Sequence, residues 1–311
     1  MTATLVALDD IRAAAERIRG VALRTPLIET PRILLKCEHL QPMGAFKIRG
    51  AYNMLAQLPA DARSAGVITY SSGNHGQAVA LAAQKLGIFS VVVMPETAPR
   101  VKVDGVRRYG GEVMFAGTTS LDRKARAEAE AAARGLTIVP PFDHPWIIAG
   151  AGTCGLEILE QCPEVSAVFV PVGGGGLISG VAAAIKGTRS DVRVIGVEPA
   201  GAAKMSASRA AGHPVTLDRT SSIADGLLPL RPGDLTFAHV RAFVDDIVTV
   251  TDEAIAGAVR WLHREAQIAA EPSGAAAAAA ALDAGLIGGR IVAIVSGGNV
   301  APEDFVKYVE G

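Results

Sequence analysis

The 311-residue sequence predicts an α/β protein with mostly parallel sheets flanked by helices. Two observations support this fold class. Apolar segments rich in β-branched residues alternate with alanine-rich helical segments along most of the chain, and several of the apolar segments are continuous. Continuous apolar segments suit strands that are buried on both faces, and strand–helix alternation is typical of parallel sheets covered by helices.

The expected elements can be assigned in chain order. Strands are predicted at residues 67–70, 90–94, 112–115, 167–170, 192–197 and 291–295. Helices are predicted at 78–86 and 177–185, from about Cys154 onward, and over the alanine run 275–281, because alanine is the best helix former. Residues 200–232 are less periodic and contain turn formers, so we expect this segment to cross the surface.

The composition excludes several classes of protein. Half of the residues are hydrophobic, which excludes disorder, and 30 Lys and Arg residues balance 31 Asp and Glu residues. A chain of net charge −1 has no overall field to attract nucleic acid or an anionic membrane. The three cysteines form no CxxC pair, so neither a disulfide framework nor a zinc site is expected. With no signal peptide or membrane-spanning segment expected either, the sequence predicts a cytoplasmic protein.

The strongest local signal is a glycine loop, Pro171-Val172-Gly173-Gly174-Gly175-Gly176-Leu177, between a predicted strand and a predicted helix. Successive glycines expose backbone N–H groups at a helix N-terminus, where the helix dipole favours an anion such as phosphate. The spacing fits neither the dinucleotide fingerprint nor the Walker loop. A purely structural turn, or a nucleotide-binding oxidoreductase with an unusual loop, remains an alternative at this stage.

Three further segments contain residue types that bind ligands in other proteins: hydroxyl and amide side chains in two of them, and a lysine in an apolar setting in the third. Ser71-Ser72-Gly73-Asn74-His75-Gly76 combines hydroxyl and amide side chains with a helix start, which suits a carboxylate, although an ordinary N-cap explains it equally well. Lys47 lies in the apolar segment Gly44–Gly50, where desolvation would lower its pKa and make the amine nucleophilic. Ser296-Gly297-Gly298-Asn299 follows a predicted strand, where open α/β proteins bind ligands.

Together these four segments resemble the fold-type II pyridoxal-phosphate enzymes, specifically the serine/threonine dehydratase and serine racemase family. The resemblance extends from Arg24-Thr25-Pro26-Leu27 to Ser296-Gly297-Gly298-Asn299 and includes Glu198-Pro199, residues 223–226 and residues 244–247. It implies a two-domain fold like that of the tryptophan synthase β subunit, with residues 1–48 and 144–311 in a large domain and 49–143 in a small one. It also implies a homodimer, and we expect no regulatory domain.

The resemblance assigns a role to each segment. Lys47 would form the Schiff base with pyridoxal 5'-phosphate and act as the catalytic base. The other cofactor-binding residues would be Phe46 against the pyridine ring, Asn74 at the ring hydroxyl, Ser296 at the pyridine nitrogen, and Gly173, Gly174, Gly175 and Gly176 at the phosphate. The substrate carboxylate would be bound by Ser71, Ser72, Gly73, Asn74 and His75. Of these, His75 is expected to position the backbone rather than act as a base.

The activity that the resemblance implies is dehydration of a 3-hydroxy amino acid. L-threonine or L-serine would first lose its β-hydroxyl as water, and hydrolysis of the resulting aminoacrylate would return that water and give 2-oxobutyrate or pyruvate plus ammonium. The alternatives are serine racemase, since Ser72 stands where racemases act on the opposite face of Cα, and a dehydratase for 3-hydroxyaspartate or phenylserine. The implied partner is therefore a small-molecule amino acid.

Two positions depart from the family pattern. Ala45 replaces a common serine, which we expect to shift rate or substrate preference rather than reaction class. Lys204 stands where several racemase-like members have an acidic ligand for Mg²⁺ or Ca²⁺, together with Glu198 and a carbonyl near Ala202. An ammonium group would repel a divalent cation, so no metal is expected. Lys204 would either pair with Glu198 in place of the ion or point to solvent.

Overall fold

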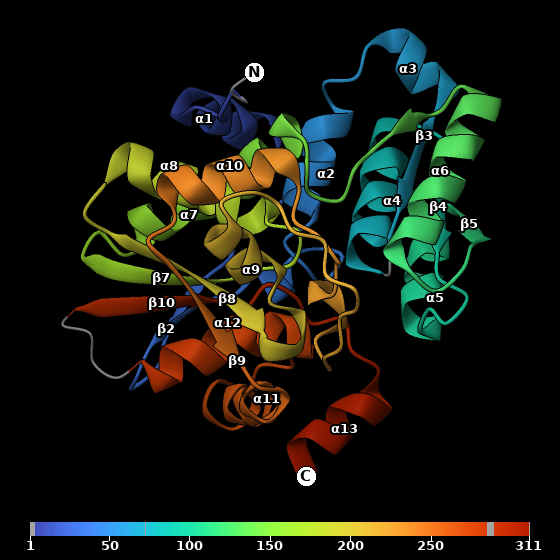
Figure 1. Ribbon diagram of the computed structural model, residues 1–311. Helices are drawn as coiled ribbons and strands as arrows, with labels where there is room; N and C mark the ends of the chain where they lie inside the picture. The colour runs from blue at the N-terminus through green and yellow to red at the C-terminus, as the bar shows by residue number, and fades with distance from the viewer. Residues whose placement is uncertain (1–3, 72, 285–288, 311) are drawn as a thin grey trace.

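The computed structural model describes residues 4–71, 73–284 and 289–310, and it contains two sheets surrounded by helices (Figure 1). The strands are β1 (Leu27–Glu29), β2 (Leu34–Lys36), β3 (Val67–Tyr70), β4 (Ser90–Met94), β5 (Glu112–Phe115), β6 (Thr137–Ile138), β7 (Val165–Pro171), β8 (Arg193–Pro199), β9 (Asp246–Val250) and β10 (Arg290–Ile294). One sheet has the order β1-β2-β10-β7-β8-β9 and the other β5-β4-β3-β6.

Helices connect most of these strands. The α-helices of the first half are α1 (Leu8–Arg17), α2 (Ile48–Leu55), α3 (Ala60–Ala65), α4 (Asn74–Leu86), α5 (Arg100–Arg108), α6 (Ser120–Arg134) and α7 (Pro145–Gln161). Those of the second half are α8 (Gly176–Thr188), α9 (Lys204–Ala211), α10 (Asp234–Phe243), α11 (Asp252–Ala266), α12 (Pro272–Asp283) and α13 (Pro302–Glu310). Short 3-10 turns occur at η1 (Glu38–Leu40), η2 (Ala200–Ala202) and η3 (Asp225–Leu227).

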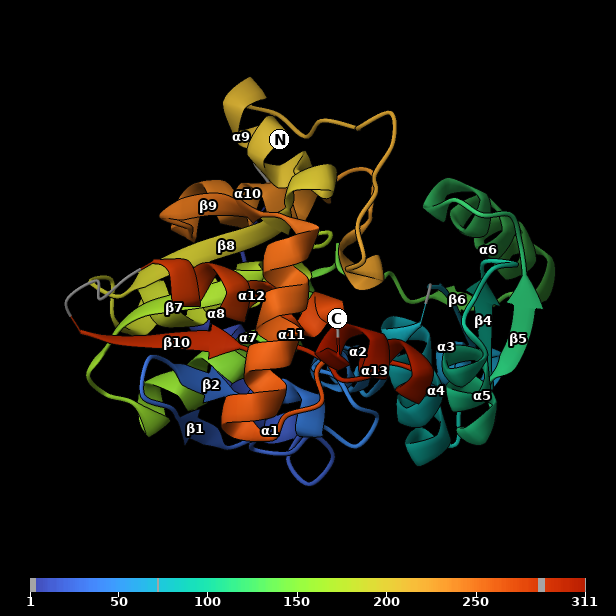
Figure 2. The same ribbon diagram turned by 90° about the horizontal axis from the view of Figure 1, so that it is seen from below.

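The six-stranded sheet is parallel except at its edge, where β1 pairs antiparallel with β2. One face packs against the alanine-rich helix α12, which α11 covers in turn, and the opposite face packs against α7 and α8 (Figure 2). The alanines of α12 are almost completely buried, because their small side chains let the helix approach the sheet closely. The strands are therefore buried on both faces, as their continuous apolar sequences predict.

The four-stranded sheet is entirely parallel. Its faces are covered by α4 with α5 on one side and by α6 on the other. Helix α2 packs against both α4 and α7, so it links the small sheet to the helices of the large one. This arrangement brings the residues around Lys47, at the start of α2, between the two sheets.

The predicted fold class is confirmed, and each predicted strand is present within one or two residues of its expected ends. The prediction for the helix near Cys154 was wrong in its start, because α7 begins at Pro145. Proline suits the first turn of a helix, and the His144 side chain accepts a hydrogen bond from the Trp146 N–H there. The segment 200–232 also contains helix α9, which the weak periodicity did not predict.

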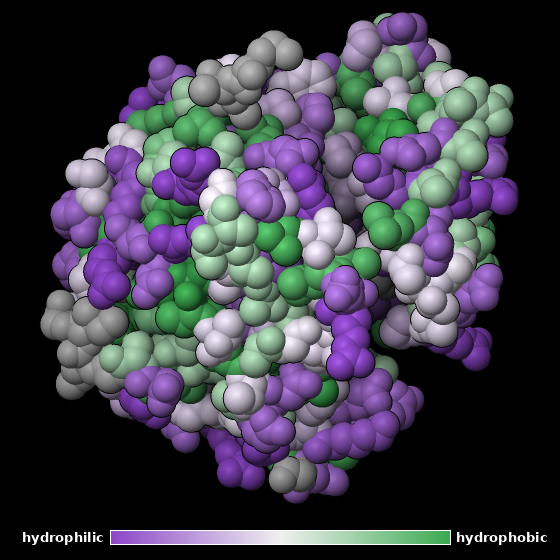
Figure 3. All heavy atoms as spheres, viewed as in Figure 1, coloured by the Kyte–Doolittle hydropathy of each residue, from purple (hydrophilic) through white to green (hydrophobic). Residues whose placement is uncertain are grey.

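The face shown in Figure 3 intersperses hydrophilic with hydrophobic side chains, as expected of a chain with nearly balanced charge. Within the described residues, no helix has both the length and the apolar composition required to cross a membrane. All three cysteines are buried and free.

Candidate active site

A cavity of about 970 Å³ lies where the carboxyl ends of strands from both sheets meet. The glycine loop that follows β7 and Ser296, which follows β10, come from the large sheet. The loop that follows β3 comes from the small sheet, and Lys47 lies at the start of α2. Neighbouring parallel strands end at the same edge of a sheet, so segments far apart in sequence converge there. The four segments singled out by the sequence thus line one cavity.

Lys47 is the N-cap residue of α2 and presents its amine to the cavity. Among the described residues, its Nζ donates one hydrogen bond, to the carbonyl oxygen of Pro141 at 2.7 Å, and it lies 5.1 Å from the centre of the Phe46 ring. Burial without a neighbouring carboxylate lowers the pKa of Lys47 to about 8. A far larger fraction of this amine is therefore neutral near physiological pH than of an ordinary lysine, although the protonated form still predominates below pH 8.

The glycine loop connects β7 directly to α8. Between described residues, the N–H groups of Gly173, Gly174 and Gly175 donate no hydrogen bond. Gly175 has φ of +99°, which strongly favours glycine, and a Cβ on Gly174 would collide with the Phe142 ring. Unpaired N–H groups at the N-terminus of a helix form a cradle for an anion, so the geometry fits a phosphate.

The loop that follows β3 ends at the N-terminus of α4. The Ser71 hydroxyl accepts a hydrogen bond from the Gly73 N–H at 3.0 Å, and Asn74 is the first residue of the helix. His75 is buried, and its Nε2 lies 3.2 Å from the Val139 carbonyl oxygen. Burial, with a smaller effect of the nearby Lys47 charge, lowers the pKa of His75 to about 3, so this imidazole is neutral. Ser72 lies outside the described residues.

Ser296 and Phe46 are held side by side by the backbone. The Phe46 N–H donates to the Ser296 carbonyl oxygen at 3.1 Å, and Ala45 forms a β-bridge with Gly297. The Ser296 side chain lines the cavity and is buried. These contacts join the Lys47 segment to the end of β10, although about 250 residues separate them in the sequence.

A charged cluster in the cavity wall was not predicted from the sequence. The Lys102 ammonium, from α5, pairs with the Asp225 carboxylate, and Glu271 Oε2 lies 3.8 Å away. Glu271 also accepts a hydrogen bond from the Asn74 side chain, whose oxygen in turn accepts one from Asn299 at 2.8 Å. Burial raises the pKa of Glu271 to about 7, against the opposing effect of Lys102. No local pattern marks these residues, because their partners are distant in the sequence.

Arg123, on α6, is a second cavity residue that the sequence did not indicate. Its guanidinium donates to the Thr118 carbonyl oxygen at 3.2 Å, while its buried Nε has no hydrogen-bond partner among the described residues. Burial lowers the pKa of this side chain.

Lys204 is fully buried behind the glycine loop rather than pointing to solvent. Its Nζ lies 3.2 Å from Glu198 Oε1 and donates to the carbonyl oxygens of Val172, Ala202 and Leu227 at 2.9–3.0 Å. The same carboxylate accepts the N–H groups of Met205 and Ser206. Burial lowers the pKa of Lys204 and Glu198 opposes that effect. The ammonium thus takes the space and the oxygen ligands that a cation would need.

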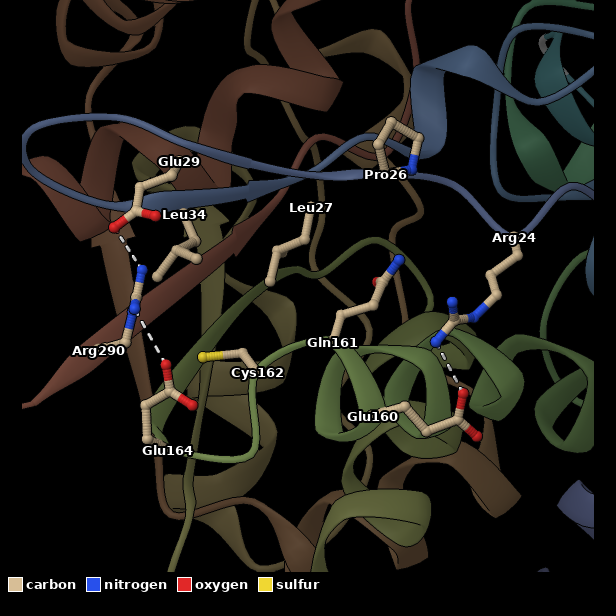
Figure 4. Close-up of a pocket in the computed structure, with 10 residues that line it drawn as sticks. All are labelled: Arg24, Pro26, Leu27, Glu29, Leu34, Glu160, Gln161, Cys162, Glu164 and Arg290. Carbon is tan, nitrogen blue, oxygen red and sulfur yellow. Dashed lines mark hydrogen bonds and ion pairs between the residues drawn. The ribbon is translucent and has the colours of Figure 1, made fainter.

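A second, smaller pocket of about 550 Å³ lies beside β1 and the end of α7 (Figure 4). The Arg290 guanidinium lies between the carboxylates of Glu29 and Glu164, and Arg24 pairs with Glu160. Each of these charged groups is already in an ion pair, although Glu29 and Glu164 share the single guanidinium of Arg290.

Comparison with known proteins identifies the cofactor for which this cavity is built. Residues 18–297 match the family described as "Pyridoxal-phosphate dependent enzyme". The chain belongs to this family. Pyridoxal phosphate is therefore its cofactor, as expected from the sequence, and the nucleotide-binding oxidoreductase alternative is withdrawn. A lysine of lowered pKa and an unpaired glycine cradle in one cavity fit the aldehyde and the phosphate of this cofactor.

Relatives within the pyridoxal-phosphate family belong to the two groups that the sequence resembles. The chain is 43% identical to the L-threonine ammonia-lyase of Thermotoga maritima over 95% of its own length and 76% of the relative's. It is equally 43% identical to a serine racemase of Oryza sativa subsp. indica, over 94% and 91% of the two lengths. The solved structure of maize serine racemase superimposes with a TM-score of 0.93 at 39% identity, covering 99% of this chain and 98% of that one.

Proposed function

We propose that this protein is a pyridoxal-phosphate dependent dehydratase that converts L-threonine or L-serine to 2-oxobutyrate or pyruvate plus ammonium. The observation that carries the proposal is the position of Lys47, whose amine faces the glycine-lined cavity and donates, within the described part of the chain, to one neutral acceptor. The similarity to the Thermotoga L-threonine ammonia-lyase supports the same reaction class. We also propose that residues 49–143 form the small domain, that the protein is a cytoplasmic homodimer, and that it needs no metal.

The residues that would hold the cofactor surround Lys47. The N–H groups of Gly173–Gly176 would bind the phosphate, Phe46 would contact the ring, and Asn74 and Ser296 would bond its polar atoms. When bound, pyridoxal phosphate withdraws electrons from the substrate Cα and so acidifies the Cα proton. A neutral serine at the ring nitrogen does not hold that nitrogen protonated, which limits electron withdrawal and favours loss of a β-substituent.

The protein supplies binding and proton transfer. Ser71, Gly73, Asn74 and the N-terminus of α4 would bind the substrate carboxylate through N–H groups and the helix dipole. Nζ of Lys47, whose pKa burial brings to about 8, would accept the Cα proton. His75 would orient the loop through Val139, because a neutral imidazole with a pKa of about 3 is a poor base.

Elimination needs a base on one face of Cα, whereas racemisation needs an acid–base group on each face. Three lysines line the described part of the cavity. Lys102 pairs with Asp225 and Lys124 pairs with Glu128, whereas no described carboxylate lies within 4.0 Å of the Lys47 amine. Lys47 thus supplies a base on one face of Cα, which is sufficient for elimination. Ser72 is the remaining candidate for the opposite face, so the racemase stays the second candidate function.

The test is to incubate the purified protein with L-threonine and with L-serine, and to follow 2-oxo acid, ammonium and D-serine separately. We expect 2-oxobutyrate and ammonium to form in equal amounts from L-threonine. D-serine accumulation without pyruvate would replace the dehydratase by the racemase. If neither substrate reacts, 3-hydroxyaspartate and phenylserine are tested in the same assay. A protein that shows no visible cofactor band would contradict the assignment of Lys47.

A further inference from the structure

Two carbonyl groups of the phosphate loop accept hydrogen bonds from side chains that do not line the cavity. Lys204 Nζ donates to the Val172 carbonyl oxygen at 3.0 Å. The Thr236 hydroxyl donates to the Gly174 carbonyl oxygen at 2.7 Å, and the Gly233 N–H makes a longer hydrogen bond of 3.3 Å to the same oxygen. Lys204 and Thr236 are both 0% exposed, and neither lines the cavity that the glycines line. Alternate carbonyls of the loop are thus fixed by two side chains from different helices.

The geometry of the peptide bond makes these contacts matter for the opposite side of the loop. In a trans peptide the C=O of one residue and the N–H of the next point in opposite directions within one plane. No cis peptide bond occurs among the described residues. Holding the carbonyls of Val172 and Gly174 away from the cavity therefore directs the N–H groups of Gly173 and Gly175 toward it. Those are N–H groups without a partner among described residues.

Thr236 is itself held rigidly at the start of α10. Asp143 accepts hydrogen bonds from the N–H groups of Asp234, Leu235 and Thr236 at 3.0–3.1 Å, so its carboxylate caps the helix. The Thr236 side chain also packs against Gly175, where an added Cβ would lie 2.9 Å from it. A fixed helix end gives the hydroxyl a fixed direction.

The segment that contains Asp143 also contacts the reactive lysine. Pro141 accepts the hydrogen bond of Lys47, the Phe142 ring packs on Gly174, and the Phe142 Cβ and backbone pack on Gly176. Three successive residues therefore contact Lys47, the phosphate loop and α10. Any shift of this segment would alter the lysine and the phosphate loop together.

We propose that Thr236 and Lys204 are positioning residues that aim the N–H groups of the glycine loop at the cofactor phosphate by holding the Val172 and Gly174 carbonyls away from it. The inference rests on the proposed role of Gly173–Gly176 as the phosphate site. Removing the Lys204 contact, or the shorter of the two hydrogen bonds to the Gly174 carbonyl, loosens the orientation of the adjacent peptide. The loss therefore falls on recognition of the phosphate rather than on attachment to Lys47.

The experiment compares two ligands on cofactor-free protein, pyridoxal phosphate and pyridoxal, which lacks the phosphate. Both attach to Lys47, and the visible absorption band of the attached form gives a dissociation constant for each. Their ratio measures how much the phosphate site contributes. For Thr236→Val, which keeps the shape and removes the hydroxyl, we expect the preference for pyridoxal phosphate to fall roughly 3- to 10-fold, as for the loss of one hydrogen bond. Thr236→Ser, which retains the hydroxyl, should keep the preference.

Thr188→Val is the matched control, because it makes the same substitution at the far end of α8, where the hydroxyl donates to the Ala184 carbonyl. It should leave both dissociation constants unchanged. If Thr236→Val raises the dissociation constants of both ligands by the same factor, or raises neither, the proposed role of Thr236 in orienting the phosphate loop is wrong. If the unaltered protein shows no preference for pyridoxal phosphate, the phosphate-site assignment itself fails. Lys204→Met should reduce the same ratio, and Thr236 keeps the proposal testable if that variant does not fold.

Discussion

Two buried lysines flank the glycine loop, and they differ in the number and the charge of their hydrogen-bond acceptors. Lys47, on the cavity side, donates to one acceptor among the residues that the structure describes, the Pro141 carbonyl oxygen. Lys204, on the opposite side, is surrounded by three carbonyl oxygens and the Glu198 carboxylate. Desolvation lowers the pKa of both amines. The comparison teaches that burial alone does not make a lysine reactive.

The number and charge of the acceptors decide the outcome. An ammonium has three protons to donate, and around Lys204 every one finds an oxygen, while Glu198 neutralises the charge. Breaking those bonds would leave a buried carboxylate without its cation, so the Glu198 contact opposes the loss of the Lys204 proton that burial favours. Lys47 has no such compensation, so losing its proton costs little, and the neutral amine is free to react.

The largest expected effect is that of removing Lys47. Lys47→Ala should lose the visible cofactor band and roughly 10³-fold or more of the activity, since a positioned base alone contributes 10²- to 10⁴-fold. The measurement is the absorption spectrum together with steady-state formation of 2-oxo acid. Lys85→Ala, an exposed lysine on α4, is the control and should leave both unchanged. Retention of the band and of turnover in Lys47→Ala would remove the basis of the proposed function.

Removing Lys204 should lower the stability of the protein more than it lowers the catalytic rate. Lys204→Met leaves the buried Glu198 carboxylate without its cation, and breaking such a pair costs about 3–5 kcal/mol of unfolding free energy. Urea denaturation of the cofactor-free protein measures this. The double variant Lys204→Met, Glu198→Gln should recover part of the loss, because no unpaired charge remains. A Lys204→Met variant as stable as the unaltered protein would show that the pair does not hold this region.

The pH dependence of cofactor attachment sharpens the comparison further. Because the pKa of Lys47 is lowered to about 8, the neutral amine is a minor species below pH 8 and the major one above it. The rate at which pyridoxal phosphate attaches to cofactor-free protein should rise with pH, reach half of its maximum near pH 8, and level off above. Stopped-flow absorbance measures this, with a free lysine derivative, of pKa near 10.4, as the reference. A midpoint near that of the reference would mean that Lys47 is not desolvated.

The smallest expected effect is that of a chelator. Since the Lys204 ammonium already binds the Ala202 carbonyl and Glu198, we expect EDTA to leave activity and thermal stability within error of the untreated protein. Loss of activity that Mg²⁺ restores would show that a divalent cation is needed after all. If the protein is inactive and neither EDTA nor Mg²⁺ changes that, the urea denaturation of Lys204→Met decides whether the Lys204–Glu198 pair stabilises this region.

Much of the site was predictable because its parts are local in sequence. The glycine loop, the loop that follows β3 and the serine after β10 each follow a strand, and parallel strands end at one edge of a sheet. The family match confirms the predicted family and cofactor, and the two helix-covered sheets confirm the predicted fold class. The roles assigned to Lys47, Phe46, Gly173–Gly176, Asn74, Ser296 and the substrate-binding residues stay predictions, although the structure brings the described ones, apart from Gly73, to the lining of one cavity.

The sequence by itself determined which chemistry the protein carries: a lysine in an apolar segment, a glycine cradle, and strands with the period of a doubly covered sheet. Only the tertiary structure decided what each charged group meets. Lys102 meets Asp225 and Glu271, and Lys204 meets Val172 and Leu227, across separations that no local pattern encodes. The physical reason is that propensity and spacing act over a few residues, whereas desolvation and pairing depend on which distant segments the packed core brings together.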